Sequence, residues 1–160
     1  MGRKTKINAE DGKQELLITR EFDLPLGLLF KAYTEPGLVE QWMGTKVLKL
    51  ESKKHGSYQF ETTDTEGKVA FRANGVIHEF VSNRKITRTF EIENAPFGVQ
   101  LEFLEFEQLT DNTSKLNMRT IYESAALRNQ VLQLPFAQGI NMAHDRLQDI
   151  LNNPDSYREK

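Results

Sequence analysis

Hydrophobic positions near the C-terminus recur every three or four residues, which is the spacing of one face of an α-helix. Pro135 suits a first helical turn, whose N–H groups have no partner within the helix, and Pro154 follows the end of the pattern. The pattern predicts a long helix over residues 135–151 with one buried face. Its apolar positions are Phe136, Ile140, Ala143, Leu147, Ile150 and Leu151.

Between residues 15 and 122 most apolar positions alternate with polar ones, as in β-strands that bury one face. Short polar or glycine-bearing turns separate the strands. Beyond Phe103 the apolar phase moves to Leu104 and Phe106, which predicts a bulge. The pattern does not decide which face of the strand over residues 68–80 points inward. The predicted strands are residues 15–22, 47–51, 55–62, 68–80, 85–92, 99–108 and 114–122.

Two short helices are predicted between the first two strands. Pro25 can open a helix through Tyr33, and Thr34 is a candidate N-cap for a second helix over residues 36–42. A further helical segment is predicted over residues 124–134.

The helical segment before Pro135 begins at Ser124, a good N-cap. Proline cannot continue a helix without losing a hydrogen bond, so Pro135 predicts either a kink or the start of a new helix. Residues 1–14 are charged and poor in apolar side chains, which predicts a flexible arm or, alternatively, a detached edge strand. Residues 154–160 are predicted to be a tail.

The order of these elements predicts an α+β domain over residues 15–153. In it, a curved antiparallel sheet of seven strands wraps round the long C-terminal helix, because only that helix is long enough to cover the apolar face of the sheet. A chain of 160 residues can bury a sufficient core as a single domain. The open edge of such a sheet is compatible with a monomer or a homodimer.

Composition narrows the classes of function. The chain has no cysteine, which excludes disulfides, thiol nucleophiles and cysteine metal sites. Its 21 Lys and Arg against 23 Asp and Glu give no overall attraction for nucleic acid. No apolar run approaches the roughly 18 residues that span a bilayer, and a polar stretch stands where a secretory signal would be apolar. We therefore expect a soluble cytoplasmic protein with neither a nucleic-acid partner nor a membrane span.

The sequence also lacks the common catalytic and metal-binding motifs. His55, His78 and His144 lie on different predicted elements and none has metal-ligand spacing. There is no nucleophile elbow and no phosphate-binding glycine loop. We therefore expect no metal and no cofactor.

Several short motifs resemble those of a known family in order and spacing. The opening matches are Leu24 and Pro25, Ala32, Thr34 to Pro36, Gln41 and Trp42, and Gly44; later matches are Gly56, Tyr58, Gly67, Gly75, Glu79, Thr89, Gly139 and Asp145 to Leu147. Over about residues 16–151 the chain is similar to the family of activators of the heat-shock-protein-90 ATPase. That family belongs to the START-like superfamily, also called birch-pollen-allergen-like. Two positions differ: Ile140 stands where the family often has tryptophan, and His144 where it usually has leucine.

The resemblance implies a helix-grip fold with a cavity between sheet and C-terminal helix that can hold an apolar or amphiphilic small molecule. For the co-chaperone branch it implies a surface that contacts a chaperone, although this chain resembles the single-domain form without the separate chaperone-binding domain. The wider superfamily also contains cyclases and hydrolases that use the same cavity. Ligand binding is our main hypothesis, with chaperone contact in a stress response and catalysis as alternatives.

Two of the candidate cavity residues have competing interpretations. Trp42 can stack on a ligand at the cavity mouth or plug the junction of helices and sheet. His144 can bind the polar end of a ligand, act as a base with Glu79 or Tyr122, or be a satisfied core residue.

Arg20 or Arg88 would supply fixed polar points in the cavity. Because a filled and a hollow core both need apolar inward faces, the sequence leaves both possibilities open. The candidate ligand-binding residues are Trp42, Tyr58, Phe60, Phe71, Phe90, Phe103, Met118, Tyr122, Ile140 and His144.

Overall fold

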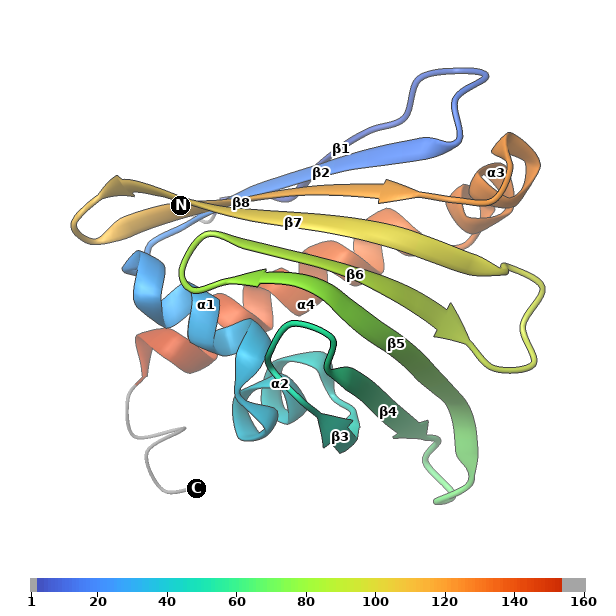
Figure 1. Cartoon of the computed structure of the whole chain (residues 1–160), viewed down its shortest axis with the longest axis horizontal. Coiled ribbons are helices and arrows are strands. Elements are labelled where there is room, and N and C mark those ends of the chain that lie inside the picture. Colours follow the sequence, from blue (N-terminus) through green and yellow to red (C-terminus); the bar gives the residue numbers. More distant parts are fainter. Residues whose placement is uncertain (1–2, 154–160) are drawn as a thin grey trace.

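The computed structural model describes residues 3–153, so the predicted tail over residues 154–160 lies outside the described residues. The described chain contains eight strands and four helices (Figure 1). In chain order they are β1 (Lys6–Asn8), β2 (Glu15–Phe22), α1 (Leu26–Thr34), α2 (Pro36–Met43), β3 (Lys46–Leu50), β4 (Ser57–Thr63), β5 (Val69–Val81), β6 (Lys85–Ile92), β7 (Val99–Thr110), β8 (Thr113–Ile121), α3 (Ala125–Gln133) and α4 (Phe136–Asn152).

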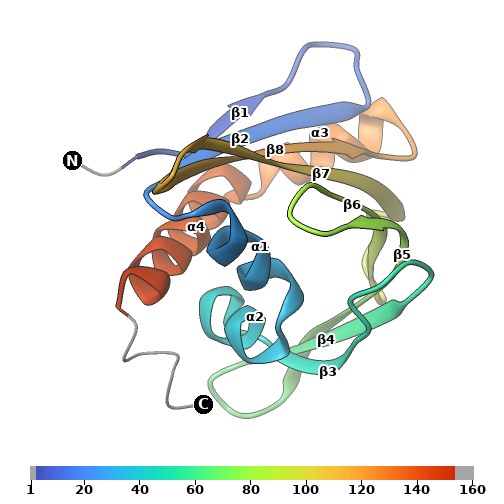
Figure 2. The ribbon, with the colours of Figure 1, turned by 60° about the vertical axis from the view of Figure 1, so that its left-hand side comes forward.

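All the strands belong to one antiparallel sheet in the order β1-β2-β8-β7-β6-β5-β4-β3. The sheet is curved, and α4 runs along its concave side (Figures 1 and 2). Helices α1 and α2 pack beside one end of α4, and α3 lies at the other end. The predicted α+β architecture, a curved sheet round a long C-terminal helix, is confirmed.

The sheet has one strand more than predicted. Residues Lys6–Asn8 form β1, which pairs with Leu17–Thr19 of β2 at the edge of the sheet. Ile7 packs against the apolar cluster beneath, and the backbone N–H of Thr5 donates a hydrogen bond to Oδ1 of Asn141 on α4, 3.0 Å away. This part of the N-terminal segment therefore forms the edge strand that the sequence offered as an alternative to a flexible arm.

The helix boundaries follow the predicted signals with one exception. Ser124 caps α3, because its Oγ accepts a hydrogen bond from the N–H of Leu127 at 3.1 Å. Pro135 occupies the N-cap position of α4, so it starts a new helix and does not kink a continuous one. The predicted capping role of Thr34 is wrong: Glu35 precedes α2, and the hydroxyl of Thr34 donates to the carbonyl of Phe30 instead.

Strand β7 carries apolar residues on both faces. Leu104 and Phe106 are buried on the inner face, whereas Phe103 lies on the outer face, where the guanidinium of Arg119 covers its ring at 4.7 Å. Pairing with β8 runs without interruption from Leu101 to Gln108. The predicted bulge beyond Phe103 is therefore wrong. The apolar phase changes there because the inner-face residue that precedes Leu104 is a glutamate, Glu102.

The interior consists of two apolar clusters. The larger one lies around α1, α2 and the C-terminal half of α4 and includes Phe30, Trp42 and Leu147. The smaller one lies beneath α3 and the start of α4 and includes Tyr122 and Val131. Met118 on β8 packs against both clusters.

Candidate functional site

A pocket of about 240 Å³ opens between the sheet and the junction of α3 and α4. One wall comes from β6, β7 and the end of β8, and the other comes from the two helices. Its lining is mainly aromatic and aliphatic, as in sites for apolar ligands. We call it the α3–α4 pocket; its lining residues are Phe90, Ile92, Phe97, Gly98, Gln100, Tyr122, Val131, Leu134 and Phe136.

The local chain geometry explains the position of this pocket. Phe90 and Gln100 are cross-strand partners on β6 and β7, so their side chains enter the pocket together. The chain changes direction at Pro135, and the flanking residues Leu134 and Phe136 both line the opposite wall. The helices therefore meet above the sheet without closing over it.

Gly98 forms the turn that leads into β7 at the pocket. Its φ of 70° lies in the left-handed region, and a Cβ there would approach Oε2 of Glu123 to 2.5 Å. The same carboxylate oxygen accepts a hydrogen bond from the N–H of Val99 at 2.7 Å. Glycine is required here so that Glu123 can fix the start of β7.

Beneath the pocket, a row of polar residues crosses the inner face of three strands. Arg88 on β6 pairs with Glu102 on β7, and Glu102 pairs with Thr120 on β8. All three are buried, and Nε of Arg88 donates to Oε1 of Glu102 at 2.8 Å. Such a buried ion pair is tolerated because each charge has a partner. We call Arg88, Glu102 and Thr120 the polar row.

Gln100 connects the polar row to the pocket. Its side-chain N–H donates to Oε2 of Glu102 at 2.8 Å, while the residue itself lines the pocket. Thr120 is 1% exposed, and its hydroxyl has no hydrogen-bond partner within residues 3–153. A buried hydroxyl without a partner costs about 1–3 kcal/mol, so Thr120 is a polar residue held inside the protein at a cost in stability.

Tyr58 closes the interior next to the polar row. The guanidinium of Arg88 lies 5.1 Å from the centre of its ring, and its hydroxyl donates to the carbonyl of Thr89 at 2.5 Å. A Cβ on Gly75 would lie 2.3 Å from the ring and 2.1 Å from that carbonyl, so only glycine leaves room for Tyr58. Burial raises the pKa of Tyr58 well above its ordinary value and keeps the phenol neutral.

The structure brings four of the ten candidate residues to the α3–α4 pocket or its apolar cluster. Phe90 and Tyr122 line the pocket directly. Met118 and Ile140 pack against the cluster that contains Tyr122. Burial raises the pKa of Tyr122 well above its ordinary value, so its hydroxyl also stays protonated.

Three other candidates lie in the larger cluster, away from that pocket. Trp42 is 6% exposed, its indole N–H donates to the carbonyl of Ala32 at 2.7 Å, and its ring packs on Tyr33. This placement supports the plug interpretation of Trp42. Phe60 is buried against the ring of Tyr58, which places both in the wall beside the polar row.

His144 is also buried in the larger cluster. Its Nδ1 lies 2.6 Å from the hydroxyl of Thr5, and its ring meets Phe22 edge-on. Burial, together with the charge of Arg20, lowers the pKa of His144 to about 4, so the imidazole is neutral at pH 7. Within residues 3–153 its hydrogen-bond partner is Thr5, and neither Glu79 nor Tyr122 bonds to it.

Phe71 and Phe103 do not reach the pocket. Phe71 has the inward phase of β5 but lies towards the end of the β4–β5 hairpin, where it is 40% exposed. Phe103 lies on the outer face of β7, because it alternates with the inner-face residues Glu102 and Leu104.

Sequence reasoning missed most of the helical wall and two members of the polar row. The helical period of α4 could have identified Phe136 as a wall residue. The alternation that places Phe106 and Leu104 on the inner face could have placed Glu102 there as well. Val131 and Leu134 carried no comparable signal, because they face the pocket only after the chain turns at Pro135. Nor did sequence alone show that Thr120 is left without a partner.

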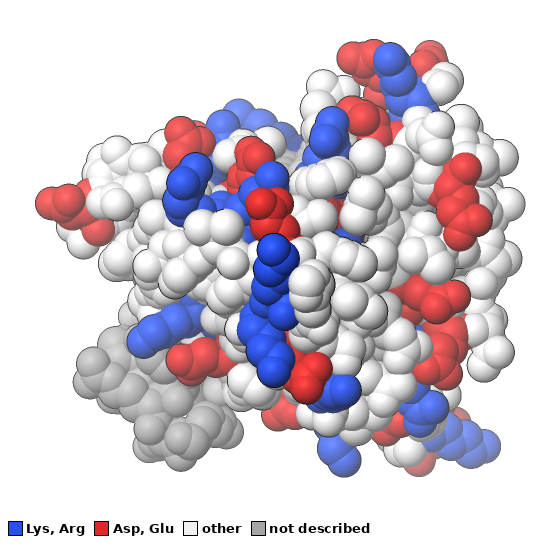
Figure 3. Space-filling view, in the orientation of Figure 1, with Lys and Arg blue, Asp and Glu red and all other residues white. Residues whose placement is uncertain are grey.

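Other kinds of site find little support in the described chain. Within residues 3–153, no group of three or more His, Asp and Glu side chains is placed to hold a metal ion. None of the helices described there is both long and apolar enough to cross a membrane. On the face in Figure 3, basic and acidic side chains are interspersed among uncharged ones.

A long helix held on the concave face of an antiparallel sheet, with a pocket between them, defines the START-like helix-grip fold. The fold is shared with a crystal structure of a protein from Rhodobacter sphaeroides (TM-score 0.83, 20% identity, 93% of this chain and 98% of that chain). It is also shared with protein Ms6760 from Mycobacterium smegmatis (TM-score 0.81, 19% identity, 92% of this chain and 96% of that chain). A solution structure of a protein from Arthrobacter aurescens has the same fold (TM-score 0.82, 16% identity, 92% of this chain and 91% of that chain).

The family is shown by the sequence itself. A family model described as Activator of Hsp90 ATPase homolog 1-like protein matches residues 23–152. The chain belongs to this family, as its motifs indicated. No curated protein gives a match.

Proposed function

We propose that this protein binds a small apolar or amphiphilic molecule in the α3–α4 pocket. The observation that carries the proposal is the combination of an apolar pocket with polar groups beneath it. Gln100, whose side chain lines the pocket, and the hydroxyl of Tyr122 provide hydrogen-bonding atoms for one polar end of the ligand. The START-like fold commonly binds hydrophobic ligands, which agrees with this proposal.

The size of the pocket limits the ligand. Its volume of about 240 Å³ is smaller than the roughly 300–1,000 Å³ of typical drug-sized sites. An apolar cavity of about 150 Å³ already holds benzene. The ligand is therefore expected to place one or two rings, or a short alkyl chain, inside the protein.

The ionisable groups support binding more than acid–base catalysis. The predicted catalytic partners His144 and Tyr122 lie in different apolar clusters, and His144 is bonded to Thr5. The polar pair beside the pocket, Arg88 and Glu102, is held together by its own hydrogen bond. These groups are arranged to position a bound molecule.

The proposal is tested by thermal unfolding in the presence of a panel of small aromatic compounds and short-chain lipids. A ligand at a hundred times its dissociation constant stabilises the folded state by about 2.7 kcal/mol. At least one compound should raise the melting temperature of the wild-type protein. Leu134→Trp, which adds a large ring at the 49% exposed pocket wall, should abolish that shift.

The matched control is Met142→Trp. Met142 is 51% exposed on α4 and is not part of the pocket lining, so the control protein should keep the ligand-induced shift. The proposal fails if no compound stabilises the wild-type protein, or if Leu134→Trp responds to the ligand as the control does.

A further inference from the structure

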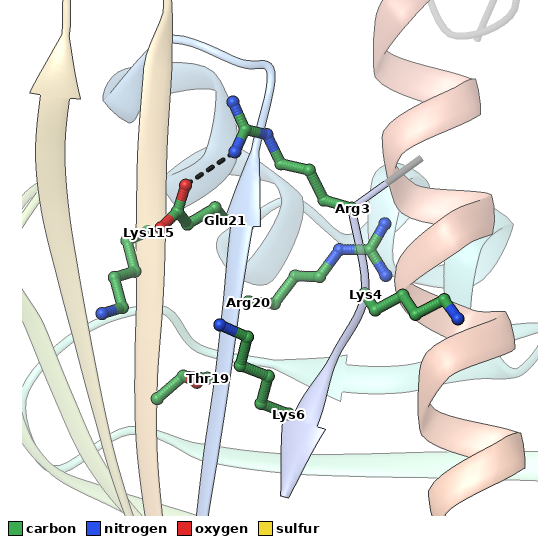
Figure 4. Close-up of a pocket in the computed structure, with 7 residues that line it drawn as sticks. All are labelled: Arg3, Lys4, Lys6, Thr19, Arg20, Glu21 and Lys115. Carbon is green, nitrogen blue, oxygen red and sulfur yellow. Dashed lines mark hydrogen bonds and ion pairs between the residues drawn. The ribbon is translucent and has the colours of Figure 1, made fainter. Parts of the chain in front are cut away.

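A second hollow, separate from the α3–α4 pocket, lies between the N-terminal segment and the sheet (Figure 4). Its volume is about 240 Å³, and five of its seven lining residues are basic. They come from the chain that leads into β1, from β2 and from β8. We call it the basic groove; its lining residues are Arg3, Lys4, Lys6, Thr19, Arg20, Glu21 and Lys115.

Arg3 pairs with the carboxylate in the groove and with a second one beside it. Nη1 of Arg3 lies 2.6 Å from Oε1 of Glu21, and Nη2 lies 3.1 Å from Oδ1 of Asp23 (Figure 4 draws the first of these). Lys115 has acidic cross-strand partners on both sides, Glu21 and Glu107, but its ammonium group forms no ion pair in the described chain.

Two further lysines contribute unpaired charge. Within residues 3–153, neither Lys4 nor Lys6 forms an ion pair, and both are exposed beside the groove. Together with Lys115 they give the groove three lysines that form no ion pair in the described chain. Positive charges of this kind raise the local concentration of anions.

Arg20 lies at the floor of the groove, and its guanidinium is directed towards α4. It is 3% exposed, and its Nη2 donates to Oδ1 of Asp145 at 2.9 Å. Its Nη1 bonds to Asn141 and, more weakly, to Thr5, at 3.3 and 3.4 Å. The buried Nε–H of Arg20 has no partner within residues 3–153, although the residue lines the groove.

We infer that the basic groove binds an oxyanion of the phosphate type. A phosphate group has enough acceptor oxygens to meet several ammonium groups together with a guanidinium N–H. The hydroxyl-bearing Thr19 lines the same hollow and adds a neutral donor. The volume accommodates a phosphate ion or the phosphate of a small monoester. This site involves none of the residues of the α3–α4 pocket, so it stands or fails independently of the proposed function.

The test is a titration of ¹⁵N-labelled protein with inorganic phosphate at constant ionic strength, with chloride as the replacement anion. Saturable shifts are expected at the amides of residues 4–6, 19–21 and 115. Lys6→Gln and Lys115→Gln should each weaken binding about two- to fivefold, as expected for loss of one exposed charge contact. Lys13→Gln, the same charge change in the loop between β1 and β2, should leave the affinity unchanged.

The two lysine variants decide the question. Shifts that do not saturate, or that weaken equally in Lys13→Gln, would mean an adventitious ion only and would overturn the inference.

Two further probes identify the source of the phosphate. Glycerol phosphate represents a soluble monoester, and vesicles of phosphatidylcholine with phosphatidic acid, compared with phosphatidylcholine alone, represent a lipid headgroup. If either probe binds, and this binding is lost in the double variant Lys6→Gln and Lys115→Gln, the result supports the site and identifies the source of the phosphate. Binding to neither probe nor to inorganic phosphate overturns it.

Discussion

His144 shows how the surroundings of one residue set its chemistry. The imidazole lies between the N-terminal segment and the core. Burial, and to a smaller extent the charge of Arg20, lower its pKa from 6.5 to about 4, against a small opposing effect of Asp145. Thr5 supplies the hydrogen bond that a buried neutral imidazole needs.

This burial predicts a loss of stability in mild acid. The unfolded chain takes up a proton at His144 near pH 6.5 and the folded protein only near pH 4, so the free energy of unfolding should fall as the pH drops between these values. The full effect is on the order of 3 kcal/mol, from about 1.4 kcal/mol for each pKa unit. Urea unfolding of the wild-type protein at pH 7 and pH 4.5 measures most of it.

His144→Gln should reduce this dependence on pH, since glutamine does not titrate. His78→Gln, at an exposed histidine on β5, is the matched control and should behave like the wild-type protein. Identical slopes for His144→Gln and the wild-type protein would show that another group controls the acid response.

At the residue scale, alternation predicted apolar inner-face residues but not the charged ones. Phe90 and Tyr122 followed from the pattern, and Arg20 or Arg88 was expected as an interior polar point, whereas Glu102 occupies an inner position where alternation expects an apolar residue. Such residues are stable inside only because a partner on another element meets them, as Asp145 meets Arg20. A single strand's sequence does not contain that partner.

At the element scale, α3 links the stability of the fold to the proposed binding site. Its N-terminus is fixed by the side chain of Ser124, and Val131 near its end lines the pocket. Loss of the cap leaves a backbone N–H without its partner at the start of the helix. The wall of the pocket should then become more mobile.

Ser124→Ala should therefore lower the free energy of unfolding by about 1 kcal/mol. Hydrogen exchange should also become faster at the amides of α3, with little change in β4 and β5. Ser82→Ala, at an exposed turn position between β5 and β6, should change stability by less than about 0.5 kcal/mol. An equal loss in both variants would argue against the cap.

The sequence predicted long elements better than short ones. Strand β6 spans Lys85–Ile92, the range that alternation predicts. β1 has only three residues, of which Ile7 alone is apolar, so its pairing depends on the neighbouring edge of β2. The start of α4 at Pro135 was one of the two outcomes that the sequence predicted.

At the scale of the whole molecule, the two apolar clusters are joined through Met118 and through the continuous sheet. Trp42 is the single tryptophan, and it lies in the larger cluster. Its fluorescence therefore reports on the end of the domain that carries α1 and α2. Far-UV circular dichroism reports on the helices and strands of the entire domain.

These two signals should give the same urea midpoint, because a domain of this size with a shared core unfolds in one cooperative step. The measurement is equilibrium unfolding followed by both probes on the same samples. A fluorescence midpoint clearly below the dichroism midpoint would mean that the helical pair unfolds before the sheet.

The architecture was predictable because each element carries its own period and the family motifs fix their order. The location of the pocket was not predictable from the sequence, because a filled core and a hollow core require the same inward apolar residues. In this protein Trp42 packs inside the larger cluster, and the change of chain direction at Pro135 leaves the α3–α4 pocket beside the smaller one.

The fit of Tyr58 against Gly75 restricts how this protein can diverge. Any amino-acid substitution of Gly75 places a carbon where the phenol ring of Tyr58 and the carbonyl of Thr89 already lie. A lineage that keeps the tyrosine must therefore keep the glycine, and a larger residue at position 75 becomes tolerable only after the ring has been lost and the strands have shifted. Substitutions at these two sites must therefore occur in a fixed order, although the sites are 17 positions apart along the chain.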